Sequence, residues 1–169
     1  MFLSYHKHMK KVQISVYYIY MITLIVVGAP KHPWSDVVAE YEKRLTPYTR
    51  IKRLTIPDES FHTASEIEKV TKKEAEKILP LLKSSIIVLL TPDGTPYTSE
   101  KFVRDFETWQ QQDTTIVIAG PLGAHEILRR KATHTCSLSS LTFTHTMALS
   151  VFLEQCYRSV MRQKGKYDY

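Results

Sequence analysis

Three short segments of this chain are apolar at nearly every position, and each of them ends at a turn-forming residue. The segments span residues 22–27, 85–90 and 115–119, and they run into Gly28, Thr91-Pro92 and Gly120 respectively. A strand with one face in water alternates apolar and polar residues, whereas a strand covered on both faces is apolar throughout. The sequence therefore predicts a sheet that is buried on both sides, which requires helices in the connections.

Helix-forming segments occupy the connections between these strands. We expect helices at 36–45 with Ser35 as the N-cap, at 65–82, 99–111, 125–131 and 147–162, and further strands at 51–56 and 136–140. Pro80 should end or distort the second helix, because proline disrupts a helix interior. The core-facing side chains of the second and third helices should be Ile67, Val70, Ala75, Ile78 or Leu79, Phe102, Phe106 and Trp109. This alternation predicts an α/β fold, a mainly parallel sheet with helices on both faces.

The length and the composition fit one globular domain. A chain of 169 residues can bury one substantial core, so residues 21–169 are expected to form a single domain. Hydrophobic residues at 43% and charged residues at 24% exclude a disordered chain, a collagen and a coiled coil. The net charge of +6 favours anionic partners. Cys136 and Cys156 lack a metal-binding or redox spacing, so we expect both in the core of a reduced, cytoplasmic protein.

The first 20 residues permit two interpretations. Lys7, Lys10 and Lys11 precede a largely apolar segment at 12–27, as in a signal peptide or a membrane anchor. Polar residues and tyrosines interrupt this segment, however, and it falls short of the ~20 apolar residues that span a bilayer. We favour the interpretation in which residues 1–20 are an extension and residues 22–27 form the first strand, with no membrane partner.

The turns that follow the predicted strands form a candidate ligand site. Ligands of open parallel sheets bind beyond the carboxyl ends of the strands, where this chain has the segments 90–94, 119–123 and 138–143. Glycines let the backbone approach a ligand closely, and free backbone groups in such turns can bind an adenine or an amino-acid moiety. Each turn alone is better explained as an ordinary connection, whereas three converging turns favour a site. The chain carries neither a dinucleotide-binding glycine fingerprint nor a P-loop.

The last helix adds candidate catalytic and RNA-binding residues. His145 lies next to its start, where a neutral imidazole can exchange a proton near pH 7; a capping or packing role is the alternative. Glu154 and Arg158 are four residues apart and could form an ordinary ion pair. Arg158 and the basic residues after it lie among tyrosines. This combination suits a nucleic-acid loop with an unstacked base, or else a solvated basic tail.

From Met21 to its end, the chain resembles the bacterial ribosomal RNA large subunit methyltransferase H family. The resemblance rests on five blocks, namely Leu24-Ile-Val-Val-Gly28, Ala39-Glu-Tyr-Glu-Lys-Arg-Leu-Thr-Pro-Tyr48, Val117-Ile-Ala-Gly120 with Gly123, Ser137-Leu-Ser-Ser-Leu-Thr-Phe-Thr-His145, and Leu153-Glu-Gln-Cys-Tyr-Arg158. Each block alone is weak, whereas the set in this order and spacing is specific.

The resemblance implies a SPOUT methyltransferase, an α/β fold whose C-terminal part forms a trefoil knot. It also implies S-adenosylmethionine (AdoMet) bound in the knot, a homodimer, and methylation of N3 of a pseudouridine in helix 69 of 23S rRNA without a metal. By position, the implied cofactor-binding residues are Leu90, Ala119, Gly120, Leu138, Ser139, Ser140, Leu141, Thr142 and Phe143. The residues implied to face the RNA are His145, Arg158 and Tyr167, and Asp168 is a further catalytic candidate.

Three departures from the family pattern bear on activity. Ala119 stands where the family usually has glycine, and an arginine common early in the last helix is replaced around Leu149-Ser150. The ending Tyr167-Asp168-Tyr169 differs from the usual Tyr-His-basic ending, and Asp168 could repel RNA phosphates or act as a base. The alternative function is therefore a degenerate family member that binds rRNA or the ribosome without methyl transfer. A membrane-tethered α/β protein is a third class.

Overall fold

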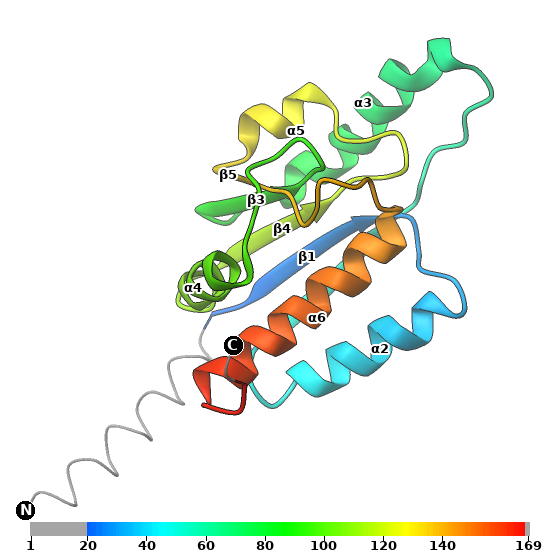
Figure 1. Cartoon of the computed structure of the whole chain (residues 1–169). Helices are drawn as coiled ribbons and strands as arrows, with labels where there is room; N and C mark the ends of the chain where they lie inside the picture. The colour runs from blue at the N-terminus through cyan, green and yellow to red at the C-terminus, as the bar shows by residue number, and fades with distance from the viewer. Residues whose placement is uncertain (1–19, 168–169) are drawn as a thin grey trace, which may run out of the picture.

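A five-stranded, all-parallel sheet forms the centre of the computed structural model, which describes residues 20–167 (Figure 1). The strands are β1 (Ile22–Val27), β2 (Ile51–Ile56), β3 (Ile86–Leu90), β4 (Thr114–Ile118) and β5 (His134–Cys136), in the order β2-β1-β4-β3-β5. The predicted parallel α/β sheet is confirmed. The register pairs Val27 with Ile56, and Leu90 with both Ile118 and Cys136, so the strands end together at one edge.

Helices cover both faces of the sheet, as continuous apolar strands require. One face carries α2 (Trp34–Leu45), α4 (Ser99–Trp109) and α6 (His145–Gln163), and the other carries α3 (Ile67–Ile78) and α5 (Glu126–Lys131) (Figure 1). Alternate residues of β1 pack on opposite sides: Leu24 and Val26 on the first face, Ile25 and Val27 on the second. All four are fully buried. Because side chains on both faces of β1 are buried, the strand is apolar along nearly its whole length instead of alternating apolar and polar residues.

Two details of the helices differ from the sequence prediction. Ser35 is not the N-cap of α2, because the helix begins at Trp34 and the Ser35 hydroxyl donates to the Asp36 carboxylate at 3.1 Å. Ile67, predicted to face the core, is 38% exposed because the start of α3 projects beyond the sheet (Figure 1). The predicted effect of Pro80 is confirmed, since α3 ends at Ile78 and the 3₁₀ turn η2 (Leu79–Leu81) follows; a second such turn, η1 (Ala64–Glu66), precedes α3.

The strand predicted at 136–140 is wrong in extent, because β5 ends at Cys136. Ser137 keeps only an isolated bridge to Pro96, and its hydroxyl donates to the carbonyls of Pro92 and Ser139 at 3.0 and 2.9 Å. Serine hydroxyls that bond to nearby backbone favour turns over strands. The serines therefore fold the segment 137–144 into a turn at the edge where the strands end.

The helix α6 runs antiparallel to the strands (Figure 1). Its first residue, His145, lies against Gly28 at the end of β1. Near its other end, the Gln163 amide donates to Gln110, which precedes β4, at 3.3 Å. Between these ends, Phe152 and Leu153 are fully buried in the core. The start of α6 thus meets the C-terminal edge of the sheet, and its end meets the opposite edge.

Within residues 20–167, no helix is long and apolar enough to cross a membrane. The strand predicted at 22–27 in the favoured interpretation of the N-terminus is confirmed as β1, whereas residues 1–19 lie outside the described part of the chain. Cys136 and Cys156 are free thiols and fully buried, which confirms their predicted place in the core.

Candidate active site

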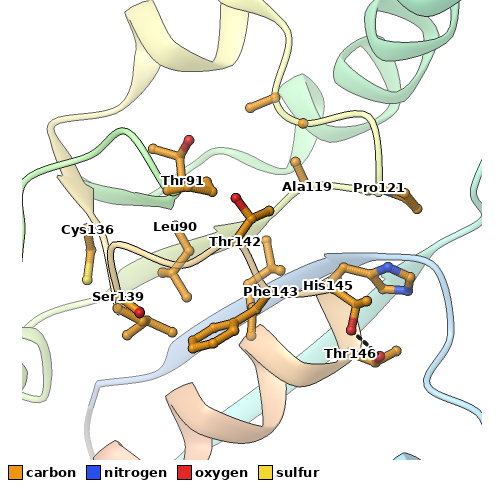
Figure 2. A pocket seen from close by; sticks show the side chains of 18 of the residues that line it. Leu90, Thr91, Ala119, Pro121, Cys136, Ser139, Thr142, Phe143, His145 and Thr146 are labelled. Atoms are coloured by element: carbon orange, nitrogen blue, oxygen red, sulfur yellow. Dashed lines mark hydrogen bonds between the residues drawn. The ribbon is translucent and has the colours of Figure 1, made fainter.

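A cavity of about 530 Å³ lies at the edge where the strands end (Figure 2). Three segments enclose it: residues 90–92 after β3, residues 118–124 after β4, and the turn after β5 together with the first residues of α6. Its volume falls within the range of small-molecule sites, and its place beyond the carboxyl ends of parallel strands is where such folds bind ligands. The three turns that the sequence singled out therefore meet at one cavity.

Eight of the nine residues that the resemblance assigned to the cofactor line this cavity. Ser140 is not among the lining residues, and its side chain is exposed. Cys136 was expected only in the core, and Thr146 and Ala148 were not predicted as site residues, yet all three also line it. The last two belong to the first turn of α6, so their place follows once that helix is known to start at the cavity. A cofactor-binding role for these residues stays a prediction.

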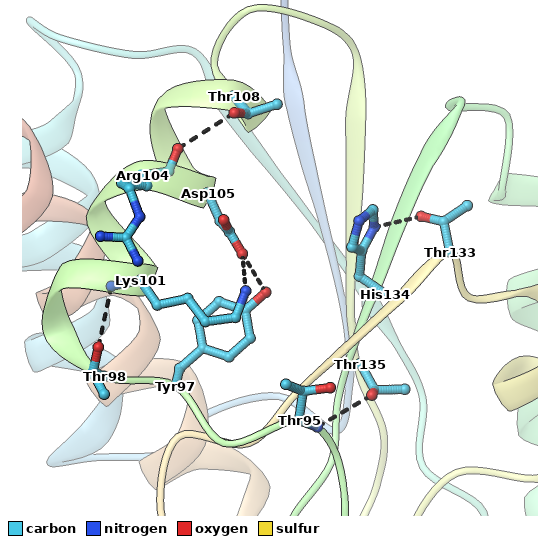
Figure 3. Close-up of polar contacts among 10 residues, drawn as sticks. All are labelled: Thr95, Tyr97, Thr98, Lys101, Arg104, Asp105, Thr108, Thr133, His134 and Thr135. Atoms are coloured by element: carbon cyan, nitrogen blue, oxygen red, sulfur yellow. Dashed lines mark hydrogen bonds and ion pairs between the residues drawn. The ribbon is translucent and has the colours of Figure 1, made fainter.

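The loop at 91–98 forms one wall, and polar contacts fix it to β5 and α4 (Figure 3). The Thr95 N–H donates to the Thr135 hydroxyl of β5 at 3.2 Å. The Tyr97 hydroxyl and the Lys101 ammonium group both donate to the Asp105 carboxylate of α4 at 2.6 Å. These contacts hold the wall in place without using a residue that lines the cavity.

Arg129 of α5 joins two walls of the cavity. Its guanidinium group donates to both carboxylate oxygens of Asp93 at 3.0 and 2.8 Å and reaches the Thr91 hydroxyl at 3.4 Å. Hydrogen bonds from Thr91, and then from Arg129, lower the pKa of Asp93. Because α5 follows the turn after β4 directly, this ion pair connects that turn to the Thr91 wall.

The imidazole ring of His145 lies on Gly28 at the rim of the cavity. A Cβ atom on Gly28 would lie 2.7 Å from Nε2 of this ring. Thr144, rather than His145, caps α6 by accepting from the Met147 N–H at 3.3 Å. Burial lowers the pKa of His145, and the charge of Asp58 opposes that effect. Nδ1 is buried without a hydrogen-bond partner among residues 20–167, so its hydrogen-bonding capacity is unused in this conformation.

Arg158 and Tyr167 lie far from His145 in the same copy of the chain. Thirteen residues of α6 separate Arg158 from His145, a rise of about 20 Å at 1.5 Å per residue. Arg158 pairs with Glu154 at 2.9 Å between Nε and Oε1, and its guanidinium lies 5.9 Å from the Tyr167 ring centroid. Asp168 lies outside the described residues. One copy therefore does not gather the RNA-facing candidates at the cavity.

Comparison with known proteins agrees with this architecture. A family model described as a predicted SPOUT methyltransferase matches residues 20–167. The chain belongs to the SPOUT methyltransferase family. A crystal structure of a probable methyltransferase from Bordetella pertussis Tohama I is similar, with a TM-score of 0.50 and 10% identity over 89% of this chain and 99% of that one. At this identity, the likeness to the solved structure concerns the fold alone.

SPOUT methyltransferases generally use AdoMet, and the walls of the cavity fit this cofactor. Apolar side chains such as Leu138 and Phe143 can flank an adenine, and the hydroxyls of Thr91 and Ser139 can bond to a ribose. Gly123 has φ +84° with open space where a Cβ would lie, so the backbone there is accessible to a ligand. No Asp, Glu, Lys or Arg is among the lining residues. Recognition would thus rest on backbone groups, hydroxyls and apolar contact.

The departures from the large subunit methyltransferase H pattern have defined positions in this SPOUT methyltransferase. Ala119 lines the cavity. Leu149 is fully buried in the core, and the Ser150 hydroxyl donates to the Thr146 carbonyl at 2.9 Å. The chain therefore has no Lys or Arg at the position in α6 where the methyltransferase H pattern has an arginine. The described residues also contain no group of three or more side chains that could hold a metal ion.

Replacing Arg129 with alanine should loosen the cavity wall at Thr91. The Arg129 and Asp93 side chains are 31% and 65% exposed, so the pair contributes at most about 1 kcal/mol. We expect the melting temperature to fall by about 1–4 °C and the AdoMet dissociation constant, measured by calorimetry, to rise roughly threefold. Arg130→Ala, an exposed neighbour on α5, is the control. Equal affinity in the two variants would show that the ion pair does not shape the cavity.

Proposed function

We propose that this protein transfers a methyl group from AdoMet to N3 of a pseudouridine in helix 69 of 23S rRNA. Membership of the SPOUT family supports methyl transfer in general. The resemblance of five sequence blocks to the ribosomal RNA large subunit methyltransferase H family supports the choice of nucleoside. The observation that carries the proposal is the position of His145, whose buried Nδ1 has no partner within the described residues and belongs to a side chain lining the cavity.

The chemistry of an imide nitrogen explains why such a histidine is useful. N3 of a pseudouridine becomes a good nucleophile only when it loses its proton. Nδ1 of His145 is buried, so the side chain must rotate to expose it; it would then accept a hydrogen bond from N3–H and take that proton as the bond from N3 to the methyl carbon forms. AdoMet supplies the methyl on a sulfonium, and breaking the C–S bond leaves a neutral thioether. The charge of Asp58 favours the imidazolium that results, until its proton passes to water.

A homodimer and a knotted C-terminal segment belong to the same proposal. Arg158 is about 20 Å from His145 along α6, so a second copy is the simplest source of a cation beside the reacting base. Ser137 pairs with Pro96 in the loop at 91–98 before the chain continues into α6. This passage of residues 137–144 beside an earlier loop is the arrangement from which a trefoil knot would be built.

Mass mapping of helix 69 is the direct test of the substrate. In ribosomes from a deletion strain, we expect the methyl group on the pseudouridine to be missing and to return after incubation with the purified protein and AdoMet. The unmodified pseudouridine should remain, because the proposed reaction adds only a methyl. A helix 69 that keeps its methylation in the deletion strain would exclude this substrate.

A degenerate family member is the alternative, and two observations favour it. Leu149 leaves the start of α6 without a cation, and Glu154 neutralises Arg158. Isothermal titration separates the two functions. Binding of helix 69 RNA without binding of AdoMet, at concentrations well above cellular levels, would support the alternative.

A further inference from the structure

One buried carboxyl group lies directly behind the wall of the cavity. Glu74 of α3 is only 4% exposed, and its side chain faces the turn after β4. A Cβ atom on Gly120 would lie 3.1 Å from Oε2 and 3.3 Å from Oε1 of this carboxyl group, and 3.1 Å from Val27. Gly120 lines the cavity. The Glu74 carboxyl group therefore lies next to a glycine of the cavity wall.

The surroundings of Glu74 do not compensate for the burial of its charge. The Glu59 N–H donates to Oε1 at 3.2 Å. Burial raises the pKa of Glu74, and the charges of Asp58 and Glu59 raise it further, against the hydrogen bond from Glu59 and the charge of Lys77. Lys73 and Lys77 both pair with Glu59, at 3.6 and 2.6 Å. An ionised carboxyl group in this position costs stability, because it has lost water without gaining an ion pair.

The cavity itself lacks a negative charge that could balance the positive charges of the proposed cofactor. Apart from His145, the described residues that line it offer no acidic or basic side chain, although the proposed cofactor carries a sulfonium and an ammonium group against one carboxylate. After methyl transfer the sulfonium has become a thioether, so the product carries one positive charge fewer. A buried carboxylate next to the cavity is only weakly screened by water, so it can distinguish a charged sulfonium from a neutral thioether. It would attract the donor and not the product.

We propose that the Glu74 carboxylate supplies the negative potential of this cavity and makes the protein bind the sulfonium donor more tightly than the thioether product. The inference rests on the proposed use of AdoMet. Glu74 does not line the cavity. Its charge would act across Gly120 without direct contact with the ligand, so Glu74 is a positioning residue. The groups that share its surroundings are Asp58 and Glu59 from the segment after β2, Lys77 from α3, and, beyond Asp58, His145.

The test compares the dissociation constants of AdoMet and S-adenosylhomocysteine by calorimetry for the wild type, Glu74→Gln and Glu76→Gln. Glutamine keeps the shape of the side chain and its acceptor for the Glu59 N–H. Glu76 is an exposed carboxylate two residues away on the same helix, so its variant is the control. At about pH 8, Glu74→Gln should weaken AdoMet binding by on the order of fivefold and leave S-adenosylhomocysteine binding unchanged. Glu76→Gln should change neither.

Two further measurements exclude a merely structural effect. Glu74→Gln should melt no lower than the wild type at about pH 8, since it removes a buried charge, whereas loss of a structural contact would lower the melting temperature. The difference in donor preference between wild type and Glu74→Gln should shrink as the pH is lowered, because the pKa of Glu74 is raised by burial and protonation removes its charge, whereas His145 is present in both proteins. Equal loss of both ligands, or an unchanged ratio, would overturn the inference. A wild type that binds neither ligand would instead overturn the proposed function.

Discussion

Replacing His145 with glutamine is expected to lower the rate of methyl transfer about 100-fold, the lower end of what a positioned general base contributes. Glutamine fills a similar volume and can hydrogen-bond, but its amide cannot take a proton at neutral pH. AdoMet affinity should change little, because the lost group acts on the nucleoside. Single-turnover kinetics with helix 69 RNA measure the rate, and calorimetry measures the affinity.

The pH dependence gives a second check on the role of His145. Burial lowers the pKa of this imidazole from its usual 6.5, so the base form persists below that value and the rate should decline only at lower pH. This acid limb should be absent in His145→Gln. His134→Gln is the control, since His134 is exposed on β5 outside the cavity. A His145→Gln protein with wild-type rate and the same acid limb would assign proton removal to another group.

The centre of the sheet could be predicted from the sequence because β1, β3 and β4 are buried on both faces. Continuous apolar segments have few other uses in a soluble chain, and β1 has the predicted bounds of 22–27. The prediction failed where serine hydroxyls bond to backbone or side-chain groups close to them in the sequence. Ser137 and Ser139 make a turn from a segment predicted as a strand, and Ser35 bonds to its neighbour Asp36 instead of capping α2. Hydropathy does not distinguish these uses of a hydroxyl group.

The candidate site was only partly accessible to sequence reasoning. The residues themselves predicted three turns at one edge, and the resemblance supplied the particular cofactor positions. Glu74 was missed because its helix is rich in charge. Helical spacing nonetheless places it four residues after Val70 and four before Ile78, in the buried stripe of α3. That His145 and not Arg158 lies at the cavity depends on the direction of α6, which is a property of the tertiary fold.

Replacing Gly28 with alanine should impair both stability and activity. Gly28 has φ +83°, a left-handed conformation that costs a residue with a Cβ roughly 1–2 kcal/mol. The melting temperature should therefore fall by about 2–8 °C. The added methyl would lie 2.7 Å from Nε2 of His145, so the ring must move, and we expect the rate of methyl transfer to fall roughly 10- to 100-fold. Thermal melts and single-turnover kinetics measure the two effects.

A matched variant and a double mutant separate the effect of backbone strain at Gly28 from the effect of its contact with His145. Gly165 has a comparable φ of +65° but open space where a Cβ would lie, so Gly165→Ala should lose stability alone. If Gly28 acts on the reaction through the imidazole, then Gly28→Ala should lower the rate no further once His145 is glutamine, because the group that it displaces is already gone. If the rate losses of the two single variants multiply in the double variant, then Gly28 serves the cavity independently of His145. The turn after β1 would then take part in ligand binding itself, beyond its support of a base.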